Sequence, residues 1–158
     1  MNKLFIIFLI FVTFASSTPI RRQDTLSGFK PCKGNFPNEI TTYNYTPNPI
    51  IVGQENTVHI TGIATVTIEN GALYKITGFY ENIQIFHHEI GFCEAIVEPS
   101  GFKCPVKDNF DFTTKFPIDN DSNDPKNTIE EYGIRIIVTN PDGKDLLCME
   151  GSIKFSYP

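Results

Sequence analysis

Three histidines are the side chains of this 158-residue sequence best suited to acid-base or metal chemistry. They are His59, His87 and His88, and none falls in a metalloprotease, nucleophile-elbow or phosphate-binding motif. His87 and His88 are adjacent, and adjacent residues of a strand point to opposite faces of a sheet. Because a metal site needs ligands that converge, this pair does not predict one.

The acidic residues show the same lack of convergence. Glu130 and Glu131 are adjacent, so they diverge if the segment is a strand. Asp119, Asp121 and Asp124 are spaced loosely like a calcium loop, but the glycine and the closing glutamate of such a loop are missing. We therefore predict a solvated acidic loop, and a protein that is not an enzyme, binds no metal and carries no cofactor.

The N-terminus predicts export. Lys3 precedes an apolar run over residues 4–12, and the small residues Ala15, Ser16 and Ser17 follow, which is the pattern of a signal peptide over residues 1–17. The run is shorter than the roughly 20 apolar residues that span a bilayer. Residues 18–31 predict an irregular leader, in which Arg21-Arg22 offers a second cleavage point after Arg22. The product would be secreted or held in a vacuolar or lysosomal lumen.

Export gives the four cysteines a structural role. Cys32, Cys93, Cys104 and Cys148 lack the Cys-x-x-Cys spacing of zinc and redox sites, and an oxidising compartment favours disulfides. We predict two, for which three pairings are open. The sequons at Asn44 and Asn120 predict glycosylation of an exported surface.

Charge argues against nucleic acid as a partner. The chain has 18 acidic and 13 basic residues, a formal net charge of −5. Proteins that bind phosphate backbones cluster Lys and Arg on one face, whereas here the basic residues are scattered among acidic ones.

Alternation of apolar and polar residues predicts strands through most of the mature chain. Asn70-Gly71 lies between two such runs and predicts a tight hairpin, and a change of parity predicts a bulge or turn at Glu81-Asn82. The residues predicted to share a strand face in this way are Val58, Ile60, Gly62, Ala64, Val66, Ile68, Tyr74, Ile76, Gly78, Tyr80, Ile83, Ile85, Phe110, Phe112, Phe116, Ile118, Tyr132, Ile134, Ile136, Val138, Leu147, Met149, Ile153, Phe155 and Tyr157.

This pattern predicts an all-β protein, an immunoglobulin-like sandwich of two antiparallel sheets with about seven strands in residues 32–158. No window sustains a helical period. Four of the 14 Phe lie in the predicted signal peptide, and the remaining ten Phe and six Tyr are expected to turn much aromatic surface inward. Two sheets packed about 10 Å apart fill the space between them, so composition alone leaves open a filled core or a cavity.

Five segments of the chain form a recognisable set: residues 68–72 (Ile-Glu-Asn-Gly-Ala), 91–94 (Gly-Phe-Cys-Glu), 103–106 (Lys-Cys-Pro-Val), 132–136 (Tyr-Gly-Ile-Arg-Ile) and 142–148 (Asp-Gly-Lys-Asp-Leu-Leu-Cys). Together they resemble the ML lipid-recognition domain family, in particular its secreted fungal phosphatidylglycerol/phosphatidylinositol transfer proteins. The resemblance implies a sandwich whose sheets part around a lipid. It also implies that Cys32 pairs with Cys148 and Cys93 with Cys104.

On this basis we expect a monomer that binds a phospholipid or a sterol in an apolar cavity between the sheets, contacts membranes transiently and transfers the lipid between them. The alternative is a secreted immunoglobulin-like interaction module with a filled core. Four lysines are candidates for an anionic head group: Lys75, Lys103, Lys107 and Lys115. The predicted lipid-binding residues are Val58, Ile60, Ala64, Val66, Phe110, Phe112, Phe116, Tyr132, Ile134, Ile136, Ile153 and Phe155.

Overall fold

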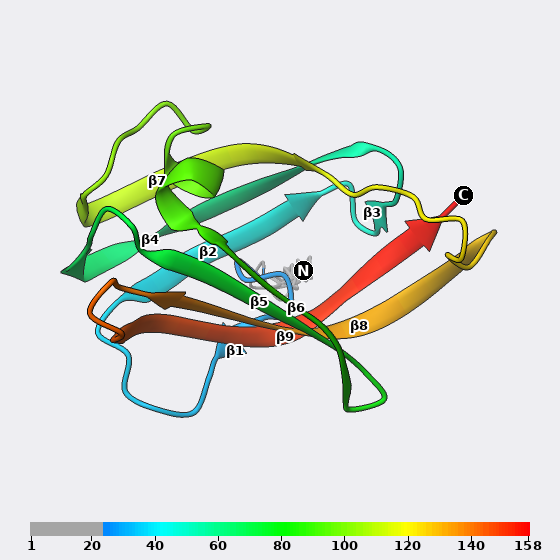
Figure 1. Cartoon of the computed structure of the whole chain (residues 1–158), viewed down its shortest axis with the longest axis horizontal. Coiled ribbons are helices and arrows are strands. Elements are labelled where there is room, and N and C mark those ends of the chain that lie inside the picture. Colours follow the sequence, from blue (N-terminus) through cyan, green and yellow to red (C-terminus); the bar gives the residue numbers. More distant parts are fainter. Residues whose placement is uncertain (1–23) are drawn as a thin grey trace, which may run out of the picture.

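A computed structural model describes residues 24–158 of the chain. The predicted signal peptide and the Arg21-Arg22 cleavage point lie outside the described residues. The described chain forms two sheets stacked face to face, as Figure 1 shows. The prediction of an all-β sandwich with two antiparallel sheets is confirmed.

The larger sheet has the strand order β1-β9-β8-β5-β6. Its strands are β1 (Lys30–Pro31), β9 (Asp145–Tyr157), β8 (Thr128–Thr139), β5 (Leu73–Tyr80) and β6 (Ile83–Gly91), with the short β3 (Ile50–Ile51) pairing in parallel with β9. The long β8 and β9 pair along nearly their whole length, so they form the centre of this layer.

The smaller sheet has three antiparallel strands in the order β2-β4-β7. They are β2 (Glu39–Thr46), β4 (Glu55–Ile68) and β7 (Val106–Pro117). Between β6 and β7 lies η1 (Cys93–Val97), a single five-residue π-helical turn that is the one helical element of residues 24–158. No helix in this part of the chain has the length and apolarity needed to cross a bilayer.

Turn residues lie where the sequence predicted turns, but the hairpin predicted at Asn70-Gly71 is wrong. Gly71, with a φ of 85°, ends a turn between β4 and β5. Because β4 pairs within the smaller sheet and β5 within the larger one, this turn carries the chain from one sheet to the other. Glu81 and Asn82 both have positive φ, 49° and 65°, which is the backbone of a two-residue hairpin whose twist matches the flanking strands. The predicted turn there is therefore confirmed, and it joins β5 to β6.

The inner face of β4 follows the predicted alternation up to Ala64 and then breaks. Val66 was predicted to point inward, but it is 42% exposed. Pairing between β4 and β7 shifts register between Ala64 and Ile68, and such an irregularity moves a side chain to the other face. The backbone of Val66 is instead bonded in both directions to the buried side chain of Asn38, at 2.8 Å each.

Two disulfides hold the ends of the described chain and η1 in place. Cys32–Cys148 ties the leader to β9 across 116 residues, and Cys93–Cys104 closes a loop of 11 residues around η1. This is the pairing that the family resemblance implied. The leader also packs, because Phe29 is buried against the backbone of Gly151 in β9.

Candidate functional site

A cavity of about 700 Å³ lies between the two sheets. Its lining comes from strands of both layers, from η1 and from the segment that follows β7. Ligand sites for small molecules occupy about 300–1,000 Å³ and are mostly apolar with a few polar groups. The volume and the lining of this cavity fit that description.

Seven of the twelve residues predicted to bind lipid line this cavity: Val58, Phe116, Tyr132, Ile134, Ile136, Ile153 and Phe155. Four others, Ile60, Ala64, Phe110 and Phe112, are buried but outside its lining. They belong to the packed part of the core. The ring of Phe110 lies over Gly62, where a Cβ atom would collide with it, so this end of the sandwich is filled with side chains. The twelfth, Val66, is exposed and points away from the cavity.

Sequence reasoning missed the lining residues that lie outside the best strands. Tyr43 and Tyr45 alternate with polar residues in β2, a period-two signal that could have found them. Ala95 and Ile96 belong to η1, which is too short to give any periodic signal. The other missed apolar residues of the lining are Ile50, Val52, Tyr74, Ile76, Ile85, Phe86, Ile90, Pro117 and Ile118.

The inner part of the cavity contains two tyrosine hydroxyls. Burial raises the pKa of Tyr43 to about 12, and the neighbouring Tyr74 hydroxyl lowers it part of the way back. Burial also raises the pKa of Tyr74 well above 10, with Tyr43 adding to the effect. Both side chains therefore stay neutral at physiological pH and offer hydroxyl groups in an apolar wall. Thr114 lines the same region and donates its hydroxyl to the backbone carbonyl of Ala95 at 3.4 Å.

The lining reaches solvent along β6 and also where β7 ends and β8 begins. We call the second region the mouth and define it by four lining residues: Asp119, Asp124, Tyr132 and Tyr157. These four side chains are exposed or half-buried. Tyr157 donates its hydroxyl to that of Tyr132 at 3.2 Å. The pKa of Tyr157 is raised, first by burial and then by Tyr132, with the charges of Asp124 and Glu130 adding to it.

Strand β6 forms a side wall of the cavity at the edge of the larger sheet. It presents apolar side chains that remain partly in solvent, with Ile85 48% and Ile90 42% exposed. His88 lines the cavity beside them, whereas His87 is bonded to Thr77 at 2.9 Å. The two adjacent imidazoles diverge, as predicted. Within residues 24–158 no group of three or more His, Cys, Asp or Glu is arranged to hold a metal.

None of the four lysines suggested for a head group lines the inter-sheet cavity. Lys115 pairs with Glu55 at 2.7 Å and Lys75 with Glu89 at 3.7 Å. Both lysines therefore form ion pairs on the outer surface of their sheets. Lys103 and Lys107 lie at a separate groove. The prediction that these lysines contact a head group at the mouth is therefore wrong. Lys75, Lys107 and Lys115 lie on outward faces of their strands, and Lys103 lies in the loop that follows η1.

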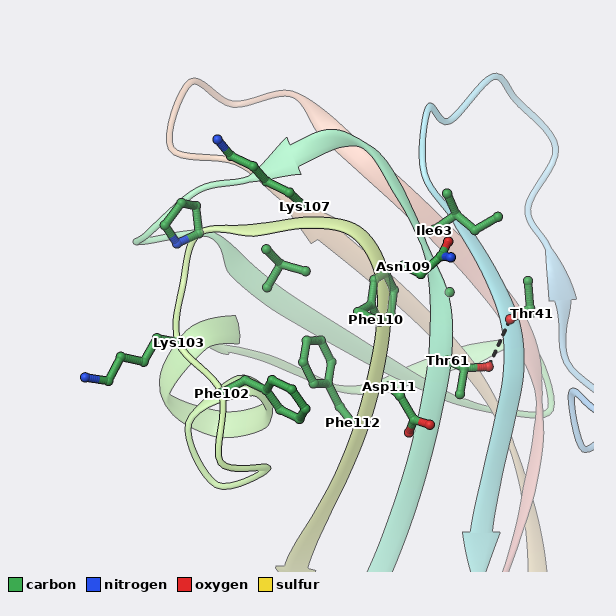
Figure 2. A pocket seen from close by; sticks show the side chains of 13 residues that line it. Thr41, Thr61, Ile63, Phe102, Lys103, Lys107, Asn109, Phe110, Asp111 and Phe112 are labelled. Atoms are coloured by element: carbon green, nitrogen blue, oxygen red, sulfur yellow. Dashed lines mark hydrogen bonds between the residues drawn. The ribbon is translucent and has the colours of Figure 1, made fainter.

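The separate groove has a volume of about 640 Å³ and lies beside β4 and β7 at the η1 end. Figure 2 shows Phe102, Phe110 and Phe112 gathered between β7 and the η1 loop, with Lys103 and Lys107 extending away from them. Phe102 is 53% exposed and packs edge-on against Phe112 at 5.5 Å between ring centroids. Polar side chains from β2, β4 and β7 line the other side, so this groove lacks the continuous apolar wall of the inter-sheet cavity.

The fold and the cavity together define a class: a small two-sheet β-sandwich with an apolar cavity between its sheets. The family model described as the ML domain matches residues 27–155, which is most of the sequence. The chain belongs to the ML domain family.

Relatives and solved structures agree with this assignment. Phosphatidylglycerol/phosphatidylinositol transfer proteins are 31% identical over 114 residues in Candida albicans and 26% over 119 residues in Kluyveromyces lactis. These matches cover 65% and 74% of this chain, but 57% and 66% of the relatives, so the chain spans less than two thirds of their length. The crystal structure of a Niemann-Pick type C2 protein from Japanese carpenter ant shares the fold, with a TM-score of 0.63 at 18% identity over 81% of this chain and 98% of the other.

Proposed function

We propose that this protein binds a lipid in the inter-sheet cavity and carries it between membranes. The observation that carries the proposal is the cavity itself, about 700 Å³ with walls that are mostly aliphatic and aromatic. Removing apolar surface from water contributes about 25 cal/mol per Å², so such walls favour an acyl chain or a sterol skeleton over a polar solute. The polar groups are few: those of the mouth, the hydroxyls of Tyr43, Tyr45, Tyr74 and Thr114, and the imidazole of His88.

Family membership supports the same function, since relatives in two fungi are named phospholipid transfer proteins. Binding requires no bond to be made or broken, and we propose a carrier without enzymatic activity that acts as a monomer. Two disulfides support folding in an oxidising compartment of the secretory pathway. The partly exposed apolar side chains of β6 are suited to transient contact with a membrane while the cargo moves.

A variant that fills the cavity tests the proposal. Ile136 is 4% exposed in the middle of β8 and lines the cavity, so tryptophan at this position would project into the space for the cargo. Ile136→Trp should lower the rate of fluorescent phospholipid transfer between vesicles at least tenfold. Native mass spectrometry should show the bare polypeptide in place of the lipid-loaded form.

The matched control is the next residue along the same strand. Ile137 points to the opposite face of the sheet, outside the cavity. Ile137→Trp adds the same bulk and should leave transfer within twofold of the wild-type rate. Thermal unfolding of both variants checks that they are folded. Equal transfer by a folded Ile136→Trp variant would rule out the inter-sheet cavity as the lipid site.

A further inference from the structure

Two carboxylates line the inter-sheet cavity, and both lie at its mouth, whereas the imidazole of His88 lines it on β6. Asp119 directly follows the end of β7, and Asp124 lies in the loop that leads to β8. Among the described residues, neither lysine nor arginine is part of the lining. A cargo seated with its apolar part between the sheets would therefore present its polar end to carboxylates.

The cations nearest in sequence and strand pairing are not part of the cavity lining. Lys126 belongs to the same loop but is exposed and outside the lining. Lys154 of β9 pairs with Glu131 at 3.9 Å, and Lys115 of β7 pairs with Glu55. The pKa of Tyr157 is raised first by burial and by Tyr132, and the charges of Asp124 and Glu130 act in the same direction.

One of the two carboxylates is held in position by the loop. Asp124 Oδ2 accepts the backbone N–H of Asp121 at 2.7 Å, and the Asp124 N–H donates to the carbonyl of Asp121 at 3.1 Å. Asp124 is half-buried, whereas Asp119 is exposed. A carboxylate fixed in this way loses little freedom when a ligand arrives, so its charge can act selectively.

Aromatic rings at the mouth provide a second, independent feature. Tyr132 packs against Phe155 with 5.4 Å between ring centroids and against Tyr80 at 5.6 Å. The Tyr157 hydroxyl is bonded to that of Tyr132. Aromatic faces attract cations, and groups of them recognise quaternary ammonium. Asp119, Asp124, Tyr132 and Tyr157 line the same cavity. Carboxylates and aromatic rings at the mouth of an apolar cavity match a lipid that ends in an ammonium group.

We propose that the cargo is a lipid whose head group ends in an ammonium group, of the choline or ethanolamine type, in preference to a net anionic lipid. The inference rests on the proposed function and narrows its substrate class. It also separates this chain from the head groups named in its fungal relatives, phosphatidylglycerol and phosphatidylinositol. The apolar walls bind the acyl chains, and the mouth selects the head group by the sign of its charge.

A competition experiment with matched acyl chains tests this inference. The full exported chain is incubated with vesicles that contain equal amounts of dioleoyl phosphatidylcholine, phosphatidylethanolamine, phosphatidylglycerol and phosphatidylinositol, together with a sterol. Bound lipid is then extracted and quantified by mass spectrometry. We expect the two ammonium lipids to be enriched about fivefold or more over the two anionic ones at low salt, with a smaller ratio in high salt because salt screens charges at the mouth.

A charge-neutral double variant links the selectivity to the two carboxylates. Asp119→Asn with Asp124→Asn removes both charges but keeps an oxygen at Asp124 that can accept the Asp121 N–H. Its selectivity should fall to within twofold. The control pair, Glu98→Gln with Asp108→Asn, removes two charges from exposed residues outside the cavity and should keep the wild-type ratio.

The outcomes separate the inference from the proposed function. Equal or greater binding of the anionic lipids by the wild-type chain overturns the inference and leaves the carrier function standing. Binding of the sterol alone does the same. Unchanged selectivity in the Asp119 and Asp124 double variant shows that the mouth is not the selector, which also overturns it. Absence of every lipid from the protein overturns the proposed function itself.

Discussion

Tyr43 and Tyr74 place two phenol groups in the apolar wall of the cavity, and their titration links this wall to stability. Both pKa values are raised because burial disfavours the charged phenolate. The unfolded chain loses these protons near pH 10, whereas the folded chain retains the Tyr43 proton to about pH 12. Between these pH values the folded state binds more protons, so raising the pH favours unfolding.

We therefore expect the titration of Tyr43 and Tyr74 to leave the free energy of unfolding unchanged below about pH 10. As the pH rises from about 10 toward 12, this free energy should fall. Each pKa unit corresponds to about 1.4 kcal/mol, so Tyr43 accounts for a loss of up to about 3 kcal/mol. Urea unfolding at a series of pH values measures this loss. Tyr43→Phe should flatten the alkaline slope in part, since Tyr45 and Tyr157 also have raised pKa values.

The control for this titration is Tyr80→Phe, which removes the hydroxyl of a tyrosine that is 42% exposed. It should leave the alkaline slope close to that of the wild type. A Tyr43→Phe variant whose stability falls as steeply as the wild type between pH 10 and 12 would contradict the assignment of this slope to the cavity wall.

At the scale of elements, the two disulfides support different parts of the molecule. Cys32–Cys148 joins the leader to β9, whereas Cys93–Cys104 fixes η1, which contributes Ala95 and Ile96 to the cavity lining. In the chain-entropy model the stabilisation grows with the length of the closed loop. The longer bridge should therefore matter more for stability and the shorter one more for binding.

Replacing each pair of cysteines by alanine separates these effects. Cys32→Ala with Cys148→Ala should lower the free energy of unfolding by about 5 kcal/mol, and Cys93→Ala with Cys104→Ala by about 3 kcal/mol. Lipid transfer, measured well below the unfolding temperature, should fall more in the second variant. Transfer that is intact without the Cys93–Cys104 bridge would contradict a role for η1 in shaping the cavity.

The strands themselves could be predicted from the sequence because burial on one face imposes a period of two. Tyr132, Ile134 and Ile136 line the cavity from β8 as expected. The pattern does not predict which inner-face residues along a strand line the cavity. Phe110 and Phe112 follow the same alternation, yet they pack in the filled end of the sandwich. Alternation identifies the inner face but carries no information on where two sheets part. The outward turn of Val66 depends on pairing with β7, which no local pattern in β4 encodes.

Over the whole molecule, packing differs between the two ends of the sandwich. At the η1 end Phe112 stacks on Phe110 with 5.1 Å between ring centroids and meets Phe92 edge-on at 6.3 Å, and these rings fill the core. Toward the mouth the sheets enclose the cavity instead. The filled end therefore gives the domain a core that does not depend on what occupies the cavity at the other end.

The size of the cavity has a consequence for the unloaded protein. Engineered dry cavities cost about 24 cal/mol per Å³, so a dry space of about 700 Å³ would cost about 17 kcal/mol, more than the ~5–15 kcal/mol by which domains are stable. The cavity must therefore contain cargo or water. Cargo at 100 times its dissociation constant adds about 2.7 kcal/mol to the free energy of unfolding.

We expect the protein to purify with lipid and to unfold at a lower temperature once the lipid is removed. For a domain of this size, about 2.7 kcal/mol corresponds to a decrease of roughly 10 °C. Differential scanning calorimetry before and after organic extraction measures it, and added phospholipid should restore the original unfolding temperature. The Ile136→Trp variant provides the control. Because the new side chain fills its cavity, organic extraction should change its unfolding temperature only slightly. A stripped wild-type chain that unfolds at the same temperature as the loaded one would show that the cargo does not occupy the space between the sheets.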